Sequence, residues 1–219
     1  MGKEDESILV FAKDKLPPVK NGVVIPDKRG NLEGLIRAEG TFMRRGDAEY
    51  DESWKQVIPY LIFRLPRYFQ DDQYFLMQRT EDGDEERLRS KYSLGIGGHV
   101  NEEDFAELGL MGWARREFDE EVWYSGRLKE RYLGIINDDS IPVNRVHLGL
   151  VILLAGDNGT IGIKDEHQSG ELITLTEMRP LYKRMESWTQ IVYQYLKAKE
   201  SRQRRSESGL YLAQSFLPS

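Results

Sequence analysis

The sequence predicts one α/β domain with a mixed β-sheet, and three observations lead to this fold class. Segments with the β-branched and aromatic composition of strands recur along the chain, around two segments with helical periodicity. A length of 219 residues with a hydrophobic fraction of 39% is sufficient for one sizeable core. We find no internal repeat or linker. We therefore expect a single domain over 1–199, with an N-terminal extension at 1–53, and a tail at 200–219.

Strands are predicted where short apolar and β-branched runs lie between turn signals. The predicted strands are 7–12, 54–65, 74–79, 93–98, 131–138, 146–155 and a strand that begins at 172. Pro59 lies inside the second of these strands. Because proline cannot donate to a β-ladder, it predicts an edge or a bulge there. The polar segment 161–171 is predicted to be an exposed loop.

Two main helices are predicted. The first covers 104–122, where an apolar stripe recurs at a spacing of four, and Asp104 with Glu107 predicts a capping pair at its start. The residues of this stripe are Leu110, Ala114, Phe118 and Val122. The second covers about 177–199. The tail after it is basic, then serine-rich, then briefly apolar, which would suit either a flexible segment or a homodimer contact.

Composition excludes several classes of protein. The net charge of −6 argues against nucleic acid or anionic lipid as a partner. The absence of cysteine excludes a disulfide framework and a cysteine-ligated metal. The N-terminus does not have the pattern of a secretory signal, and no apolar run approaches the roughly 18 residues of a membrane span. We therefore expect a cytoplasmic protein that does not enter a membrane.

The segment R-E-F-D-E-E at 116–121 contains several acidic side chains whose negative charges should repel one another. On a helix, Glu117 lies beside both Glu120 and Glu121, at a cost of a few tenths of a kcal/mol per like-charged pair. A solvated helix face tolerates such a cost and is the commoner explanation. A divalent cation among the carboxylates would also explain it, since hard cations take oxygen ligands. The Gly-Gly turn at 97–98 favours the second explanation, because glycine lets the backbone turn in conformations closed to other residues, so that the Gly98 carbonyl could face the same ion.

The stretch 98–123 resembles a Nudix box, whose pattern is G-x5-E-x7-R-E-U-x-E-E-x-G-U, with U a bulky apolar residue. Gly98 matches the first glycine, and 116–121 matches R-E-U-x-E-E. An arginine-bearing strand precedes the box, and strands and a helix follow it, as in that family. The resemblance covers roughly residues 55–198 in layout, and it implies a Nudix-like α/β/α sandwich with a mixed β-sheet.

The stretch departs from this pattern in three places. Arg116 follows Gly98 by four more positions than the pattern has, which is close to one helical turn. The first glutamate, counted back from Arg116, falls on Leu108, with Asp104 and Glu107 nearby but out of register. The late glycine falls on Trp123.

The resemblance implies a metal site. Glu117, Glu120 and Glu121 would bind Mg²⁺ or Mn²⁺, and the Gly98 carbonyl would add a ligand. Arg116 would hold the glutamates in place for catalysis.

The resemblance also implies hydrolysis of a pyrophosphate bond in a nucleoside diphosphate linked to another group. Glu117 and Glu120 would serve both the metal and the proton that the attacking water loses. In this family a further acid often comes from a later loop. Glu166 is the first candidate here, and Glu171 and His167 lie in the same loop.

Substrate contacts are expected before and just after the glycine turn. Arg79 ends a predicted strand, and an arginine fork suits phosphate. His99 follows the glycines and could touch a phosphate. His147 lies in an apolar strand, where a buried structural role is the commoner one.

Three alternatives stay open. A Nudix-fold sensor would bind a nucleotide without cleaving it, but it has no need of three repelling acids. An isomerase of isopentenyl diphosphate on the same fold usually relies on a cysteine, which this chain lacks. An unrelated α/β protein with an acidic helix is the third. The sequence does not choose among dinucleoside polyphosphates, nucleotide sugars, oxidised nucleotides and capped RNA.

Overall fold

The computed structural model describes residues 2–16, 20–26, 32–80, 89–164 and 167–214, with the backbone alone at 32 and 204–214. Its strands are β1 (Ser7–Ala12), β2 (Val23–Pro26), β3 (Gly40–Arg44), β4 (Trp54–Leu65), β5 (Gln73–Arg79), β6 (Tyr92–Ser93), β7 (Gly95–Ile96), β8 (Val122–Tyr124), β9 (Leu128–Asn137), β10 (His147–Gly156), β11 (Ile161–Ile163) and β12 (His167–Thr174). Its helices are η1 (Lys3–Asp5), η2 (Lys13–Lys15), α1 (Leu32–Glu39), α2 (Arg45–Ala48), α3 (Glu102–Glu121), α4 (Pro142–Arg145), α5 (Leu175–Met178), η4 (Arg179–Arg184) and α6 (Ser187–Gln214).

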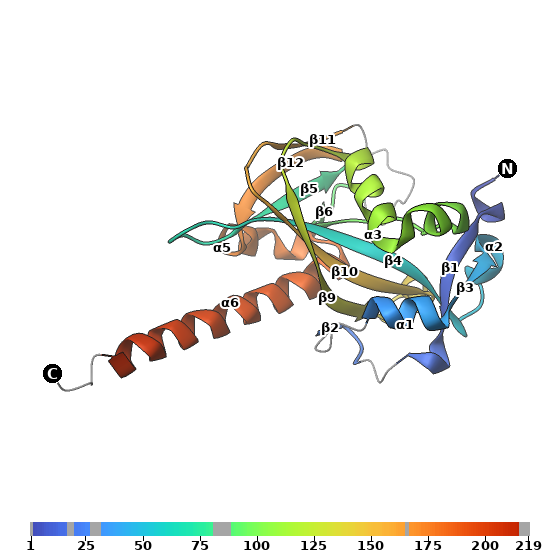
Figure 1. The fold of residues 1–219 in the computed structure, drawn as a ribbon, viewed down its shortest axis with the longest axis horizontal. Helices are drawn as coiled ribbons and strands as arrows, with labels where there is room; N and C mark the ends of the chain where they lie inside the picture. The colour runs from blue at the N-terminus through green and yellow to red at the C-terminus, as the bar shows by residue number, and fades with distance from the viewer. Residues whose placement is uncertain (1, 17–19, 27–31, 81–88, 165–166, 215–219) are drawn as a thin grey trace.

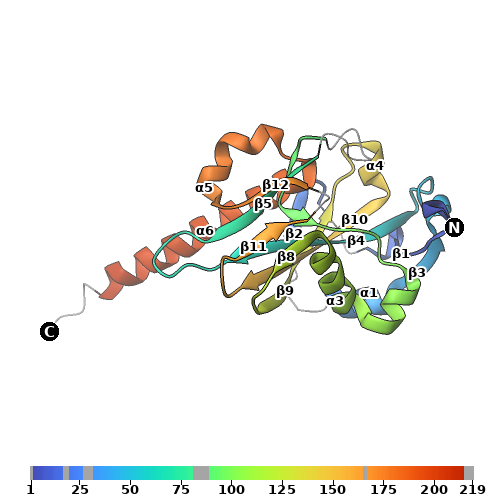
Figure 2. The same cartoon turned by 90° about the horizontal axis from the view of Figure 1, so that it is seen from above.

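The centre of the molecule is a mixed sheet with helices on both faces (Figures 1 and 2). Its main path runs β12-β5-β4-β10-β9-β2, and β1, β3, β6 and β7 join it at the sides. β4 and β10 run parallel, whereas their other neighbours on this path run antiparallel. α3 covers one face and α6 covers the other. The predicted α/β/α sandwich with a mixed sheet is therefore confirmed.

The two faces of β4 supply two hydrophobic cores. Leu61 and Phe63 belong to the core that contains the buried residues of α3, whereas Tyr60 and Ile62 belong to the core beneath α6. Successive strand residues point to opposite faces, so a strand buried on both sides is a nearly continuous apolar run. This explains why the sequence 54–65 reads as one unbroken strand.

Part of β4 has a strand neighbour on one side only. Among the described residues, 54–56 pair with β1 and 61–62 pair with β7, while 57–60 pair with β10 alone. Pro59 lies in this stretch, where one side of the strand carries no ladder. The prediction that Pro59 marks a sheet edge is therefore correct locally, although β4 is a central strand.

The acidic helix α3 begins at Glu102, two residues before the predicted start. Asn101 is its N-cap and accepts a hydrogen bond from the Asp104 backbone, so the predicted capping role of Asp104 is wrong. The predicted stripe is confirmed, since all four of its residues are buried. The helix is broken at Gly109, which has φ 67° and ψ −179°. Only glycine adopts such a conformation readily.

Two further predictions need correction. The segment 161–171 is not an exposed loop, because β11 and the start of β12 lie within it. The final helix, predicted over 177–199, begins at Ser187 and continues to Gln214, and α5 and η4 precede it. α6 extends beyond the sheet, at the opposite end of the molecule from the N-terminus (Figure 1). None of the described helices is long and apolar enough to cross a lipid bilayer.

Candidate metal and substrate site

The glycine turn that precedes α3 brings bare backbone against a carboxylate. A Cβ atom added to Gly98 would lie 2.4 Å from Oε1 of Glu117. Gly98 is not among the described residues with positive φ, so its backbone conformation does not require glycine. A Cβ atom there would displace the end of the Glu117 side chain, whereas a Cβ atom at Gly97 would lie 2.4 Å from the Pro59 carbonyl oxygen, so the close backbone approach requires glycine at 97. The special turn conformation expected from the sequence is therefore not found at Gly98.

The three box glutamates do not share one environment. Glu117 and Glu121 lie one helical turn apart and are partly buried, whereas Glu120 is exposed. Nη1 of Arg116 donates to Oε1 of Glu120 at 2.6 Å. Two acids are therefore directed inward, and the third is held at the surface by Arg116.

Asp104 is the second partner of Arg116, which the sequence analysis did not identify. Nη2 of Arg116 donates to Oδ2 of Asp104 at 2.6 Å. Counted forward from Gly98, Asp104 is the sixth residue, where the box has its first glutamate. Counting backward from Arg116 had placed that position on Leu108. The four extra residues lie between Asp104 and Arg116, and the helix break at Gly109 lies in the same interval.

Of the candidates in the later segment, His167 lies closest to the box. Its Nε2 atom is 3.8 Å from Oε2 of Glu121, and its side chain is 1% exposed. Burial, followed by the nearby Arg79 guanidinium, lowers the pKa of His167 to about 4. Glu171 is exposed on β12. Glu166 lies outside the described residues.

A cavity of about 580 Å³ opens beside the one-sided stretch of β4. Its lining combines three cations, three acids and an apolar wall around Ile58 and Trp188. It is lined by Lys3, Glu4, Arg45, Gly46, Glu49, Tyr50, Ile58, Tyr60, Arg79, Gly95, Gly97, Gly98, His99, Val143, Asn144, His147, Glu186, Ser187 and Trp188. Gly98 is therefore shared: it touches Glu117 on one side and the cavity on the other.

His99 lines this cavity as a neutral side chain with a fixed tautomer. The amide of Gln56 donates to Glu49 at 3.2 Å, so its oxygen faces His99 Nε2 at 2.6 Å and accepts from it. His99 therefore keeps Nδ1 as a hydrogen-bond acceptor. Burial, followed by Arg45 and His147, lowers the pKa of His99 to about 3. An acceptor nitrogen suits an N–H group of a ligand, and the phosphate contact expected for His99 stays a prediction.

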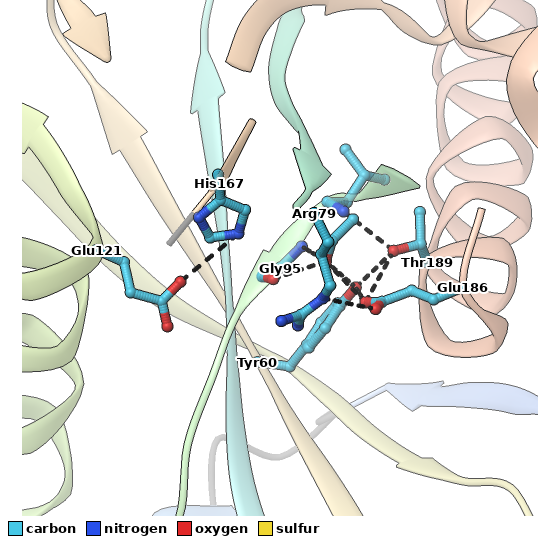
Figure 3. A network of polar contacts seen from close by, with 9 residues as sticks. Tyr60, Arg79, Gly95, Glu121, His167, Glu186 and Thr189 are labelled. Atoms are coloured by element: carbon cyan, nitrogen blue, oxygen red, sulfur yellow. Dashed lines mark hydrogen bonds and ion pairs between the residues drawn. The ribbon is translucent and has the colours of Figure 1, made fainter. Parts of the chain in front are cut away.

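Arg79 also lines the cavity, and a buried acid holds it (Figure 3). Its Nε atom lies 3.5 Å from Glu186, whose side chain is 8% exposed. Glu186 also accepts hydrogen bonds from Tyr60 at 2.8 Å and from Ser93 at 2.7 Å. Burial and the Glu186 charge raise the pKa of Tyr60, which therefore stays a donor. Glu186 is 107 positions from Arg79 in the sequence, and no local pattern could have paired them.

The side chains around Gly98 fit a hard divalent cation. All the box donors are carboxylates, and the Glu117 carboxylate fills the space that a Cβ on residue 98 would take. Among the described residues, no three carboxylate or imidazole groups form a ready-made cage. This is compatible with Mg²⁺, which usually binds one or two carboxylates and completes its shell with water and substrate phosphates.

Comparison with known proteins gives two relatives over almost the full length. The chain is 36% identical over 211 residues to protein YmaB of Bacillus subtilis (strain 168), and the match covers 90% of this chain and all of that protein. It is 32% identical to Tm1382, whose crystal structure is described as that of a Nudix hydrolase. The TM-score is 0.71, over 87% of this chain and 98% of the other.

A more distant match shows the fold alone. The Nudix domain of Shewanella oneidensis NrtR, crystallised with ADP-ribose, has a TM-score of 0.52 and 10% identity, over 66% of this chain and 88% of that one. No family model matches the sequence.

The ion pair between Asp104 and Arg116 should be measurable in stability. Replacing Asp104 by Asn removes a charge-assisted hydrogen bond from a partly exposed pair, so the free energy of unfolding in urea should fall by about 1 kcal/mol. Glu107 is exposed on the same helix, and Glu107→Gln should change that energy by less than about 0.5 kcal/mol. Equal losses of unfolding free energy in the two variants would contradict the assignment of Asp104 as a stabilising partner of Arg116.

The neutral state of His99 should appear in the pH dependence of stability. Its folded pKa of about 3 lies below the unfolded value of 6.5, so the unfolded state binds a proton first as the pH falls. Its contribution is complete above pH 6.5 and is lost progressively below it. Between pH 6 and 5, the unfolding free energy of the wild-type protein should fall with decreasing pH more steeply than that of His99→Gln. We expect the two slopes to differ by about 1 kcal/mol per pH unit. Identical slopes in variant and wild type would show that His99 does not titrate in this way.

Proposed function

This chain belongs to the Nudix hydrolase family, and we propose that it hydrolyses a pyrophosphate bond in a nucleoside diphosphate joined to another group, with a divalent cation held by its box glutamates. One observation carries the proposal: Gly98 touches the Glu117 carboxylate and also lines the cavity of about 580 Å³. Ligand sites of small molecules typically have about 300–1,000 Å³. A nucleotide in this cavity would have its phosphates beside the box.

In the proposed site, Glu117 and Glu121 supply the inward oxygens for the cation, and the Gly98 carbonyl is a further candidate ligand. When bound, the cation would neutralise phosphate charge and lower the pKa of a water molecule. Glu120 lies about one helical turn from Glu117 and accepts a hydrogen bond from Arg116. It is the candidate to complete the metal shell and to accept the proton of that water. Glu166 is kept as an alternative proton acceptor.

Arg79 is the candidate phosphate ligand on the cavity side. Its guanidinium can offer a fork to phosphate oxygens while Glu186 holds it in place. The buried hydrogen bonds of Glu186 with Tyr60 and Ser93 fix the acid that holds Arg79.

The apolar part of the cavity suits a nucleobase. The Trp188 and Tyr60 rings pack edge to face with centroids 5.7 Å apart, and Ile58 lies on the same lining. The acceptor nitrogen of His99 would receive an N–H of the base. ADP-ribose, the ligand of the fold relative NrtR, is a nucleoside diphosphate of this class.

The proposal is tested with a panel of nucleoside diphosphate derivatives in the presence of Mg²⁺ or Mn²⁺, with product release as the measurement. We expect turnover of at least one compound, and Glu117→Gln should lower it by about a hundredfold or more. The matched control is Asp119→Asn on the same helix. Its side chain is 55% exposed and pairs with Arg115 instead, so turnover should stay within about twofold.

Two results would contradict this function. Equal losses in the two variants would show that Glu117 has no special role. Binding of a panel compound in a calorimeter without any turnover, under both metals, would support a nucleotide sensor in place of a hydrolase.

A further inference from the structure

His167 is buried without hydrogen-bond partners. Its side chain is 1% exposed, and neither of its ring nitrogens has a partner among the described residues. A buried polar group in that state costs about 1–3 kcal/mol, so native proteins rarely leave one unmatched. Where one persists, an ion or a functional role is a common explanation.

The position of His167 is set by two elements. It begins β12, where its cross-strand partner on β5 is Arg79. Its ring is directed across to α3, toward Glu121 (Figure 3). The imidazole thus lies between the residue proposed to bind phosphate and an acid proposed to bind metal.

The separation between His167 and Glu121 is informative. At 3.8 Å, Nε2 and Oε2 are too far apart for a hydrogen bond. Two ligand atoms that each lie about 2.0–2.2 Å from one ion are roughly 2.8–3.6 Å apart in octahedral or tetrahedral geometry, so a small side-chain movement would bring the pair to that separation. The Glu121 side chain is 13% exposed, so the pair lies at the boundary between core and surface.

We propose that Nε2 of His167 is a nitrogen ligand of the divalent cation that Glu121 holds, so that the site favours transition-metal ions over Mg²⁺. Imidazole suits ions such as Co²⁺ and Zn²⁺, whereas Mg²⁺ prefers oxygen. The inference rests on the proposed function for the position of the cation. It adds a ligand from outside the box, and a metal preference that the carboxylates alone would not give.

The test measures metal binding in the absence of substrate. Co²⁺ and Mg²⁺ have similar ionic radii and differ mainly in their preference for nitrogen, so calorimetric titration with each isolates the role of the imidazole. We expect His167→Phe to weaken Co²⁺ binding by about tenfold or more, and Mg²⁺ binding by less than about threefold. The absorption spectrum of bound Co²⁺ should also change, since it reports on the ligands of the ion.

Two variants serve as controls. His147→Phe makes the same change at a histidine that lines the cavity and whose Nδ1 atom faces the Val143 carbonyl, and it should leave the ratio of Co²⁺ to Mg²⁺ affinity unchanged. Glu121→Gln should weaken the binding of both metals. Melting temperatures are recorded for each protein. Should His167→Phe fold poorly, His167→Gln carries the same expectation.

An unchanged affinity ratio in the His167 variants would overturn the proposal, as would a wild-type protein that binds Co²⁺ no more tightly than Mg²⁺. A purely structural His167 would give that unchanged ratio, with equal or higher stability in His167→Phe because two unmatched nitrogens are removed. These outcomes do not depend on turnover. Failure of the hydrolase assignment would appear in the nucleotide panel instead.

Discussion

The approach of a bare backbone to a carboxylate, at Gly98 and Glu117, determines how the parts of the site are arranged. The Glu117 carboxylate on α3 occupies the space that a Cβ atom on residue 98 would take. The turn in turn forms one wall of the cavity, so the distance from the acids to a bound ligand is set by the backbone. Gly97 packs its backbone on the Pro59 carbonyl of β4, and this contact fixes the position of the turn on the sheet.

The sheet supports this arrangement by leaving one strand incompletely paired. β4 is buried on both faces and therefore cannot move, yet residues 57–60 have a neighbour on one side only. Gly97 lies against the Pro59 carbonyl in that stretch, and the Ile58 and Tyr60 side chains on either side of Pro59 line the cavity. On the same strand, Tyr60 connects through Glu186 to the start of α6. The turn beside the box acids and the apolar wall proposed for a nucleobase are thus both in contact with β4.

Periodicity predicted those parts of the fold in which each residue contacts a continuous core. β1 and β4 have the predicted bounds, and the buried stripe of α3 is the predicted one. The errors fall where tertiary contacts override local composition. The composition of 161–171 predicts a solvated loop, but pairing with β8 makes 161–163 a strand, and pairing with β5 makes a strand that begins at His167 and buries it.

The candidate site was predictable only as far as its local motif extends. The motif located Gly98 and 116–121, because its spacing lies within one turn and one helix. It did not identify Asp104 as the partner of Arg116. The four extra residues shift the position counted backward from Arg116 but not the position counted forward from Gly98. Long-range pairs such as Arg79 with Glu186 leave no trace in the local sequence.

The break at Gly109 divides α3 into a first segment that carries Asp104 and a second segment that carries Arg116 and the box acids. The arm that follows it presents the acids at an azimuth fixed by their packing on the sheet, while the arm that precedes it only has to return Asp104 to Arg116. A hinge of this kind lets the connecting segment change in length without turning the acids away from the cavity. In this chain, Asp104 and Arg116 therefore meet in space although they are four residues further apart in sequence than the box pattern has them.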